Sequence, residues 1–226
     1  MKKILLFLLT ILVLTSCSKD DSNVLYVYNW GEYIEPALIE KFEKETGIKV
    51  IYDTFEQNED MYMKVKEGGN NYDVVVPSDY MAEKMIKQGM LEKIDYSKIP
   101  NFKYIDEKFR NLDYDPKNEY TVPYMWGTVG ILYNKNKVKE KVDSWNILWD
   151  EKYKDNIIMM NSTRDTLGVA LKRLGYSMNS RNEAELEKAK ESLIKQKDIV
   201  LAYLVDETKN QMANEEADLA VMYSGD

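Results

Sequence analysis

Residues 24–52 read VLYVYNWGEYIEPALIEKFEKETGIKVIY, and they decide the fold class. The first five residues are β-branched, aromatic or leucine, which predicts a strand that ends at the loop of residues 29–31. Pro36 marks the start of a helix and Gly47 its stop. IKVIY at residues 48–52 predicts a second strand. The segment therefore folds, on this interpretation, as a strand, a helix and another strand.

The same alternation continues for three more elements. Residues 61–66 predict a helix that ends at the glycines of residues 68–69. Residues 72–76, YDVVV, are apolar enough to predict a strand buried on both faces, and residues 81–89 predict a further helix. Such alternation is typical of an open parallel sheet with helices on both faces. The predicted fold class is α/β.

The α/β pattern restarts after Asn134. Strands are predicted at residues 156–160, 199–204 and 218–222, and helices at residues 144–149, 165–174, 183–195 and 208–215. The apolar run at residues 120–133 predicts an extended segment. We therefore expect a first lobe at residues 24–133 and a second at residues 134–226. Because the sequence stops directly after a core-type strand, we expect the second lobe to be truncated.

Residues 1–16 have the composition of a signal peptide, with two lysines before an apolar run at residues 4–14. A helix of that length spans about 16 Å, roughly half of a bilayer core. Cys17, the only cysteine, follows small residues, as in the lipobox of bacterial lipoproteins. We expect lipid on Cys17, a tether at residues 17–23 and a membrane-anchored protein in the periplasm or on the outer face of the cell membrane. The alternative is an ordinary secretory leader.

Composition excludes several classes of function. The formal net charge of −8 repels phosphate backbones, so we expect no nucleic-acid partner. The chain has no histidine, which excludes Ser-His and Cys-His nucleophile pairs and histidine metal sites. A single cysteine excludes an intrachain disulfide and a Cys-cluster zinc site. Neither a Gly-rich phosphate loop nor a GxSxG motif is present. We expect no metal, no cofactor and no catalytic residue.

Aromatic side chains and single acids gather after the predicted strands, where open sheets bind their ligands. They are, together with the small residues beside them, Trp30, Gly31, Glu32, Tyr33, Ser78, Asp79, Tyr80, Trp126, Ser162, Asp165, Tyr223 and Asp226. Aromatic faces attract organic cations, and a carboxylate in the same wall supplies the opposite charge. The pattern predicts a site for a cationic organic ligand. The alternative is that Trp30, Tyr33 and Trp126 only pack the core.

Five separated stretches resemble one protein family in the same order along the chain. They are residues 28–68, 72–85, 120–134, 143–157 and 166–177. The first contains YNWGEY, the second reads YDVVVPSDYMAEKM and the third YTVPYMWGTVGILYN. They resemble the periplasmic polyamine-binding proteins of ATP-driven spermidine and putrescine importers, the PotD and PotF type. The resemblance implies the type II periplasmic binding protein fold, in which two α/β lobes close on a linear polycation.

The resemblance also implies ligand contacts at the matching positions. They are Trp30, Glu32, Tyr33, Ser78, Tyr80, Asp165, Tyr223 and Asp226. Asp165 is one methylene shorter than the usual glutamate, and Tyr223 replaces the usual tryptophan. Ser162 stands where spermidine-type relatives carry an aspartate, whereas Asp226 matches an acid of the putrescine type. Tyr80 matches the spermidine type instead. We expect putrescine to be preferred, with spermidine or dual binding as the alternative.

The implied function is that of a monomeric lipoprotein that delivers putrescine or spermidine to the permease subunits of an ABC importer. Two alternatives stay open. One is the same fold with another ligand, such as a sugar, Fe³⁺ or an amino acid. Arg164 is the only arginine near a predicted site loop, which disfavours an amino acid because its carboxylate calls for arginine. The other is an extracytoplasmic glycoside hydrolase, whose carboxylate pair needs no histidine.

Overall fold

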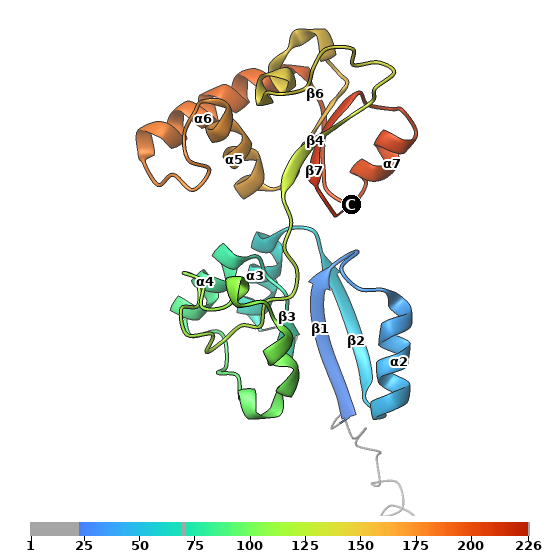
Figure 1. The fold of residues 1–226 in the computed structure, drawn as a ribbon, viewed down its shortest axis with the longest axis vertical. Helices are drawn as coiled ribbons and strands as arrows, with labels where there is room; N and C mark the ends of the chain where they lie inside the picture. Colours follow the sequence, from blue (N-terminus) through green and yellow to red (C-terminus); the bar gives the residue numbers. More distant parts are fainter. Residues whose placement is uncertain (1–22, 69–70, 226) are drawn as a thin grey trace, which may run out of the picture.

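Two α/β lobes make up the part of the chain that the computed structural model describes, residues 23–68 and 71–225 (Figure 1). We refer to residues 24–109 as lobe 1 and to residues 129–225 as lobe 2. A three-stranded sheet lies at the centre of lobe 1 and a four-stranded sheet at the centre of lobe 2. The α/β fold class is confirmed.

Strands and helices alternate through lobe 1. Its elements are β1 (Val24–Trp30), α2 (Pro36–Thr46), β2 (Lys49–Phe55), α3 (Asn58–Glu67), β3 (Val74–Val75), α4 (Asp79–Lys87), and the 3-10 helices η2 (Tyr96–Lys98), η3 (Pro100–Tyr104) and η4 (Glu107–Phe109). The strand order is β2-β1-β3, and both pairs are parallel. Right-handed crossovers to opposite sides of β1 put α2 on one face of the sheet and α3 on the other (Figure 1).

The helix α2 begins and ends where the sequence predicts. Pro36 occupies its first turn, where the missing backbone N–H costs nothing. Gly47 has a φ of 71°, and its N–H donates to the carbonyl of Glu43. A left-handed residue of this kind ends helices and favours glycine. The chain therefore turns directly into β2, which starts at Lys49.

The strand β3 differs from the prediction. Residues 72–76 were expected to form a strand buried on both faces, but only Val74 and Val75 pair with β1, and Val74 is 44% exposed. In the described part of the chain β3 is an edge strand, so its outer side has no neighbour. Its position still matters for function because the chain continues from β3 directly into Ser78 at the start of α4.

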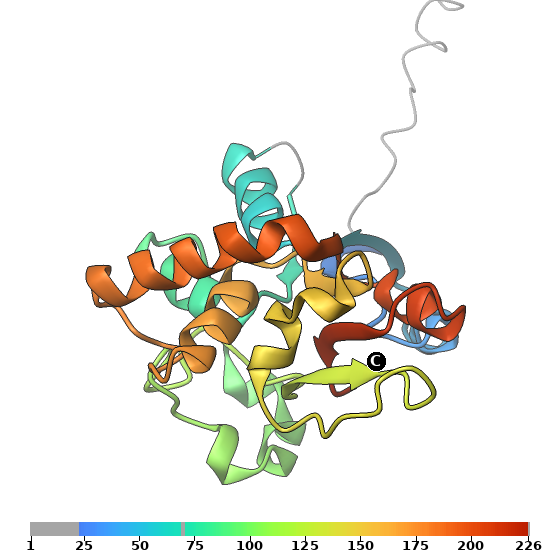
Figure 2. The same cartoon turned by 90° about the horizontal axis from the view of Figure 1, so that it is seen from above.

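Lobe 2 begins with a strand that runs against the others. Its elements are β4 (Val129–Tyr133), η5 (Trp145–Trp149), η6 (Glu151–Tyr153), β5 (Ile157–Met160), α5 (Thr163–Arg173), α6 (Glu183–Gln196), η7 (Lys197–Ile199), β6 (Val200–Leu204), α7 (Thr208–Ala213) and β7 (Leu219–Tyr223). The sheet order is β4-β7-β5-β6, and only β4 is antiparallel to its neighbour. The helices α5 and α6 lie on one side of this sheet and α7 on the other (Figure 2).

Sheet pairing moves the boundary between the lobes. Lobe 1 was expected to extend to residue 133, but β4 pairs with β7 in lobe 2, so the chain crosses between the lobes before Val129. Of the apolar run at residues 120–133, only β4 belongs to a sheet. The buried Asp115 precedes the crossing and accepts hydrogen bonds from the backbone N–H groups of residues 119–121. This buried carboxylate fixes the turn from which the crossing segment starts.

Each lobe has its own core. In lobe 1 the buried side chains are mainly aromatic residues and methionines, namely Tyr28, Phe55, Met61, Tyr62, Met81 and Met85. In lobe 2 all four residues of β5 are buried, and they pack with Leu219 and Val221 of β7. A strand buried on both faces is what a central position between β6 and β7 requires. The strands that lead to the candidate site are therefore well buried in the core of lobe 2.

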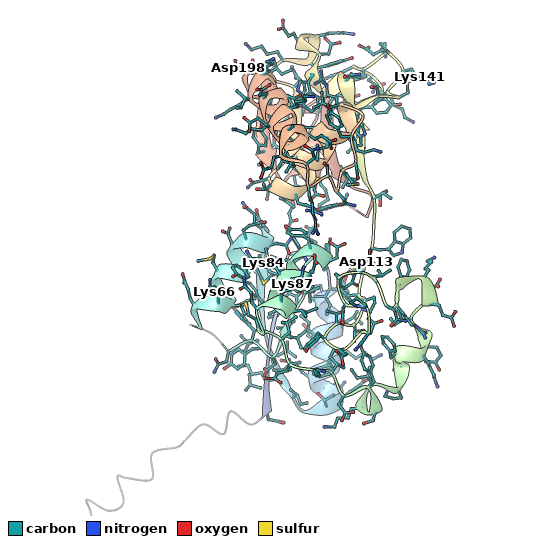
Figure 3. All side chains as sticks on the ribbon, turned by 90° about the vertical axis from the view of Figure 1, so that its left-hand side faces the viewer. Lys66, Lys84, Lys87, Asp113, Lys141 and Asp198 are labelled. Carbon is teal, nitrogen blue, oxygen red and sulfur yellow. The ribbon has the colours of Figure 1, made fainter. Side chains whose placement is uncertain are left out.

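The carboxyl ends of the parallel strands of the two sheets face each other (Figure 1). We call the region between them the junction and define it by residues 29–33 and 77–80 of lobe 1 and residues 161–165, 205–209 and 223–225 of lobe 2. Beside these residues, Arg181 of lobe 2 and Glu83 of lobe 1 form an ion pair at 3.9 Å. Figure 3 places Lys141 and Asp198 at the end of lobe 2 far from lobe 1. Ligands of open α/β sheets bind at such carboxyl edges.

Candidate functional site

A hydrogen-bonded network forms the lobe 2 side of the junction. The carboxylate of Asp165 accepts a hydrogen bond from the Tyr223 hydroxyl at 2.8 Å and from the Ser162 hydroxyl at 2.6 Å. Ser162 is the N-cap of α5 and also accepts the backbone N–H of Asp165. Since a serine cap and an acid in the first turn both suit a helix N-terminus, the local sequence holds this carboxylate in place.

The Tyr223 phenol connects this network to lobe 1. Burial raises the pKa of Tyr223, and the negative charge of Asp165 and the hydrogen bond to it raise this pKa further. Tyr33 and Tyr80 of lobe 1 also lie near enough to raise it. Tyr223 therefore stays a neutral hydrogen-bond donor at physiological pH, and its pKa responds to tyrosines of both lobes.

Tyr80 lies near acids of both lobes, and its helix is anchored within lobe 1. Burial raises its pKa, the charge of Glu59 adds to the effect, and Asp165 acts in the same direction. Its hydroxyl donates to Glu59 at 3.3 Å. Ser78, two residues earlier, donates its backbone N–H to the buried side chain of Asn58, whose amide donates to the Ser78 hydroxyl at 3.0 Å. The start of α4 is thereby anchored to α3.

Trp30 and Tyr33 form an aromatic group at the end of β1. The ring of Trp30 lies 4.6 Å from that of Phe55 and 5.8 Å from that of Tyr33, between ring centroids. The Tyr33 carbonyl accepts a hydrogen bond from the hydroxyl of Tyr124 in the crossing segment. Trp30 packs on the lobe 1 core, so it serves both the core and the edge of the junction.

Glu32 and Gly31 contact lobe 2. The Glu32 carboxylate forms an ion pair with Lys209 at the start of α7. A Cβ on Gly31 would lie 2.5 Å from a carboxylate oxygen of Asp206, so a larger residue would displace the Asp206 side chain. The absence of a side chain at Gly31 therefore allows the loop after β6 to approach the loop after β1.

The remaining predicted residues have other surroundings. Asp79 is exposed and accepts the backbone N–H of Tyr80. Trp126 is 69% exposed, and its ring lies 5.4 Å from that of Phe109 in lobe 1. Asp226 and Cys17 lie outside the described residues. The structure thus joins Asp165, Ser162 and Tyr223 in one network, with Tyr33 and Tyr80 near enough to raise the pKa of Tyr223. Glu32 pairs with Lys209, and Trp126 lies against Phe109.

Two cationic residues also lie at the junction: Arg164, which the sequence already placed near a predicted site loop, and Lys209, which a search for acids and aromatics missed. Lys209 follows β6 just as Asp165 follows β5, so its place after a predicted strand was the available signal. Arg164 precedes Asp165, and its guanidinium carbon lies 5.2 Å from the centroid of the Tyr80 ring. Among residues 23–68 and 71–225, no group of three or more Cys, Asp or Glu side chains is arranged to hold a metal ion.

Two α/β lobes whose strand ends meet over acids and tyrosines define a two-lobed binding protein of the type II periplasmic class. The family described as bacterial extracellular solute-binding protein matches residues 37–226, and the chain belongs to it. Residues 1–18 match the prokaryotic membrane lipoprotein lipid attachment site. The protein is thus an extracytoplasmic lipoprotein anchored to the membrane. Within the described residues, no helix has the length and apolar character needed to cross a bilayer.

Curated proteins similar to this chain are named as polyamine-binding proteins. The chain is 43% identical over 214 residues to the spermidine/putrescine-binding periplasmic protein of Escherichia coli (strain K12), covering 94% of this chain and 62% of that protein. It is 41% identical to the putrescine-binding periplasmic protein SpuD of Pseudomonas aeruginosa (strain UCBPP-PA14), covering 91% of this chain and 60% of that protein. The chain therefore spans about three fifths of the length of these relatives.

One solved structure shares the fold closely over most of the chain. The TpPotD lipoprotein of Treponema pallidum superposes with a TM-score of 0.82 at 38% identity, covering 89% of this chain and 64% of that chain. Its two-lobed fold supports the architecture described above.

Proposed function

We propose that the protein binds putrescine or spermidine at the junction and delivers it to the permease subunits of an ABC importer. The observation that carries the proposal is the Asp165 carboxylate, which accepts the Tyr223 hydroxyl in lobe 2, while its neighbour Arg164 lies over the ring of Tyr80 in lobe 1. Carboxylates supply charge-assisted hydrogen bonds to ammonium groups, and aromatic faces suit the positive charges and the methylene chain between them. Glu32, at the edge of the same junction, adds a second acid. A monomeric state belongs to the same proposal.

The polyamine names of the relatives support this assignment and disfavour the other ligands. A sugar would also suit aromatic rings, but it is neutral and brings no positive charge to pair with two carboxylates. An iron(III) site built on tyrosines needs phenolates, whereas burial and nearby acids raise the pKa values of Tyr80 and Tyr223 and favour the neutral phenols. The family match places the chain among binding proteins, and no observation favours the glycoside hydrolase alternative.

Calorimetric titration tests the proposal. The full-length, leaderless protein should bind putrescine and spermidine, and putrescine should bind at least as tightly. The same protein should show no heat of binding with glucose, glycine or Fe³⁺-citrate. Binding of one of these three with no response to either polyamine would contradict the proposal. Spermidine binding tenfold tighter than putrescine would reverse the predicted preference only.

Ser162→Asp should shift the preference towards spermidine by about tenfold, the effect of one added charged hydrogen bond. Aspartate caps helices as well as serine does, so α5 should stay intact. The added carboxylate would lie beside Asp165 and attract the ligand with the larger positive charge. Ser162→Asn is the matched control, because it keeps the cap and adds no charge. An unchanged ratio of the two dissociation constants would show that this position does not act on the ligand.

A further inference from the structure

One acid of the proposed site, Glu32, already forms an ion pair with an ammonium group of the protein itself, that of Lys209. Lys209 lies in the first turn of α7 in lobe 2, and its side chain forms the ion pair with Glu32 of lobe 1. The Lys209 side chain is 31% exposed and that of Glu32 is 53% exposed. The pair therefore lies at the rim of the junction, partly shielded from water. Glu32 is also the acid that our proposed function assigns to a ligand ammonium.

The backbone of two loops brings Lys209 to this position. The loop after β6 approaches the loop after β1, where the Asp206 carboxylate lies against the Cα side of Gly31 and takes the space that a Cβ would fill. Asp206 lies three residues before Lys209, and α7 starts between them. The contact at Gly31 and the ion pair thus lie within three residues of each other along the loop after β6, and both join it to the loop after β1.

A second cationic side chain of lobe 2, that of Arg164, contacts an aromatic ring of lobe 1, that of Tyr80. The Arg164 guanidinium lies over the Tyr80 ring, and it also donates to the side chain of Asn179 at 3.1 Å. Tyr80 is the aromatic residue of lobe 1 that meets Asp165 at the junction. One carboxylate and one aromatic face of lobe 1 are thus both engaged by cationic side chains of lobe 2. These are the two chemistries by which the site would recognise an organic ammonium.

We propose that Lys209 is a specificity-determining residue that competes with the ligand for Glu32. The inference rests on the proposed polyamine function. A ligand ammonium that approaches Glu32 must displace the lysine or share the carboxylate with it, and two like charges at one acid repel each other. Lys209 thereby lowers the affinity for every cationic ligand, and it excludes cations too weakly charged to displace it. The interaction between exposed groups is screened by salt, so the effect should shrink as ionic strength rises.

An ion pair between two lobes can also have the opposite effect and strengthen ligand binding. If Lys209 and Glu32 served as a latch, their pairing would hold the lobes together around a ligand, and loss of the lysine would weaken binding. Competition and latching therefore predict opposite signs for one substitution. The sign of the change in affinity decides between them.

The test is the substitution Lys209→Met in the full-length, leaderless protein, titrated with putrescine and spermidine by calorimetry. Methionine keeps the length of the side chain and removes its charge. We expect both ligands to bind about twofold to fivefold more tightly, the scale of a partly exposed ion pair. The gain should fall when the titration is repeated at high salt. Lys209→Arg retains the charge and should bind as the unmodified protein does.

Two further variants separate competition from a general charge effect. Lys195→Met removes a positive charge in the last turn of α6 and should leave both affinities unchanged. Glu32→Gln removes the contested carboxylate and should weaken binding. In that background, Lys209→Met should lose most of its gain, because the lysine no longer has a carboxylate to contest. An equal gain with and without Glu32 would overturn the proposal.

The outcomes also distinguish this inference from the proposed function. If the unmodified protein binds polyamines but Lys209→Met leaves the affinity unchanged or lowers it, the inference is wrong and the proposed function stands. If neither the unmodified protein nor Lys209→Met binds either polyamine, both are wrong.

Discussion

Replacing Asp165 by asparagine should weaken polyamine binding by about 2–5 kcal/mol, roughly thirtyfold to several thousandfold. Asp165 is half-buried and lies at the centre of the junction, where it accepts the hydroxyls of Tyr223 and Ser162. Those hydroxyls orient the carboxylate without neutralising its charge. A ligand ammonium that loses its water there needs this charge, because an unpaired ammonium out of water costs several kcal/mol. Calorimetric titration with putrescine measures the loss.

Three measurements isolate the role of the carboxylate in this variant. Asp198→Asn changes the net charge equally at the end of lobe 2 far from lobe 1 and should leave the affinity unchanged (Figure 3). Asp165→Glu restores the acid with one more methylene and should recover most of the binding. A thermal unfolding curve shows whether Asp165→Asn keeps the fold. A folded Asp165→Asn variant with normal affinity would remove this acid from the site.

The order of strands and helices follows from local sequence patterns. The apolar run before residue 29, the proline and glycine that bound α2 and the buried run of β5 are all features of a few neighbouring residues. Their period and end signals are set by backbone geometry, so they can be recognised without tertiary contacts. The two carboxyl edges follow in turn, because parallel strands end on the same side of a sheet. Five of the predicted site residues meet at those edges.

The pairing of strands that are far apart in the chain could not be predicted from the sequence. The run at residues 120–133 is rich in apolar residues on both sides of Val129, and nothing local shows that Val129 begins a strand of the second sheet. That membership depends on β7, which is the last strand of the described chain. Val74 shows the same limit, since its exposure depends on which strand lies beside β3. Whether a segment joins a sheet depends on both strands of the pair, and the pattern along one segment describes only one of them.

The predicted set of site residues was incomplete for a different reason. A search for groups that attract a cation finds Glu32, Asp165 and the tyrosines, and passes over Lys209. A binding site for a charged ligand also depends on internal groups of the same charge as the ligand, because they set how strongly each carboxylate is already engaged. Lys209 lies at Glu32 through the approach of two loops at Gly31, which the sequence alone does not show.

Replacing Cys17 by alanine should release nearly all of the protein from the membrane fraction. Residues 1–18 match the lipoprotein attachment site, and Cys17 is the only cysteine of the chain. Each methylene of an attached acyl chain contributes about 0.8 kcal/mol of membrane affinity, so loss of the lipid removes far more than any residual surface contact supplies. The acidic surface, with a formal net charge of −8, adds no attraction to anionic lipid.

Incorporation of radiolabelled palmitate and sedimentation of membranes measure the effect together. The unmodified protein should take up the label and sediment with the membranes, whereas Cys17→Ala should do neither. Ser18→Ala, one residue beyond the attachment site, should behave as the unmodified protein does. If Cys17→Ala loses the label but still sediments, its size on a gel decides the cause. An uncut leader of 16 residues would explain retention by the apolar run at residues 4–14. A fully processed variant that stays on the membrane would show that something other than lipid on Cys17 anchors the protein.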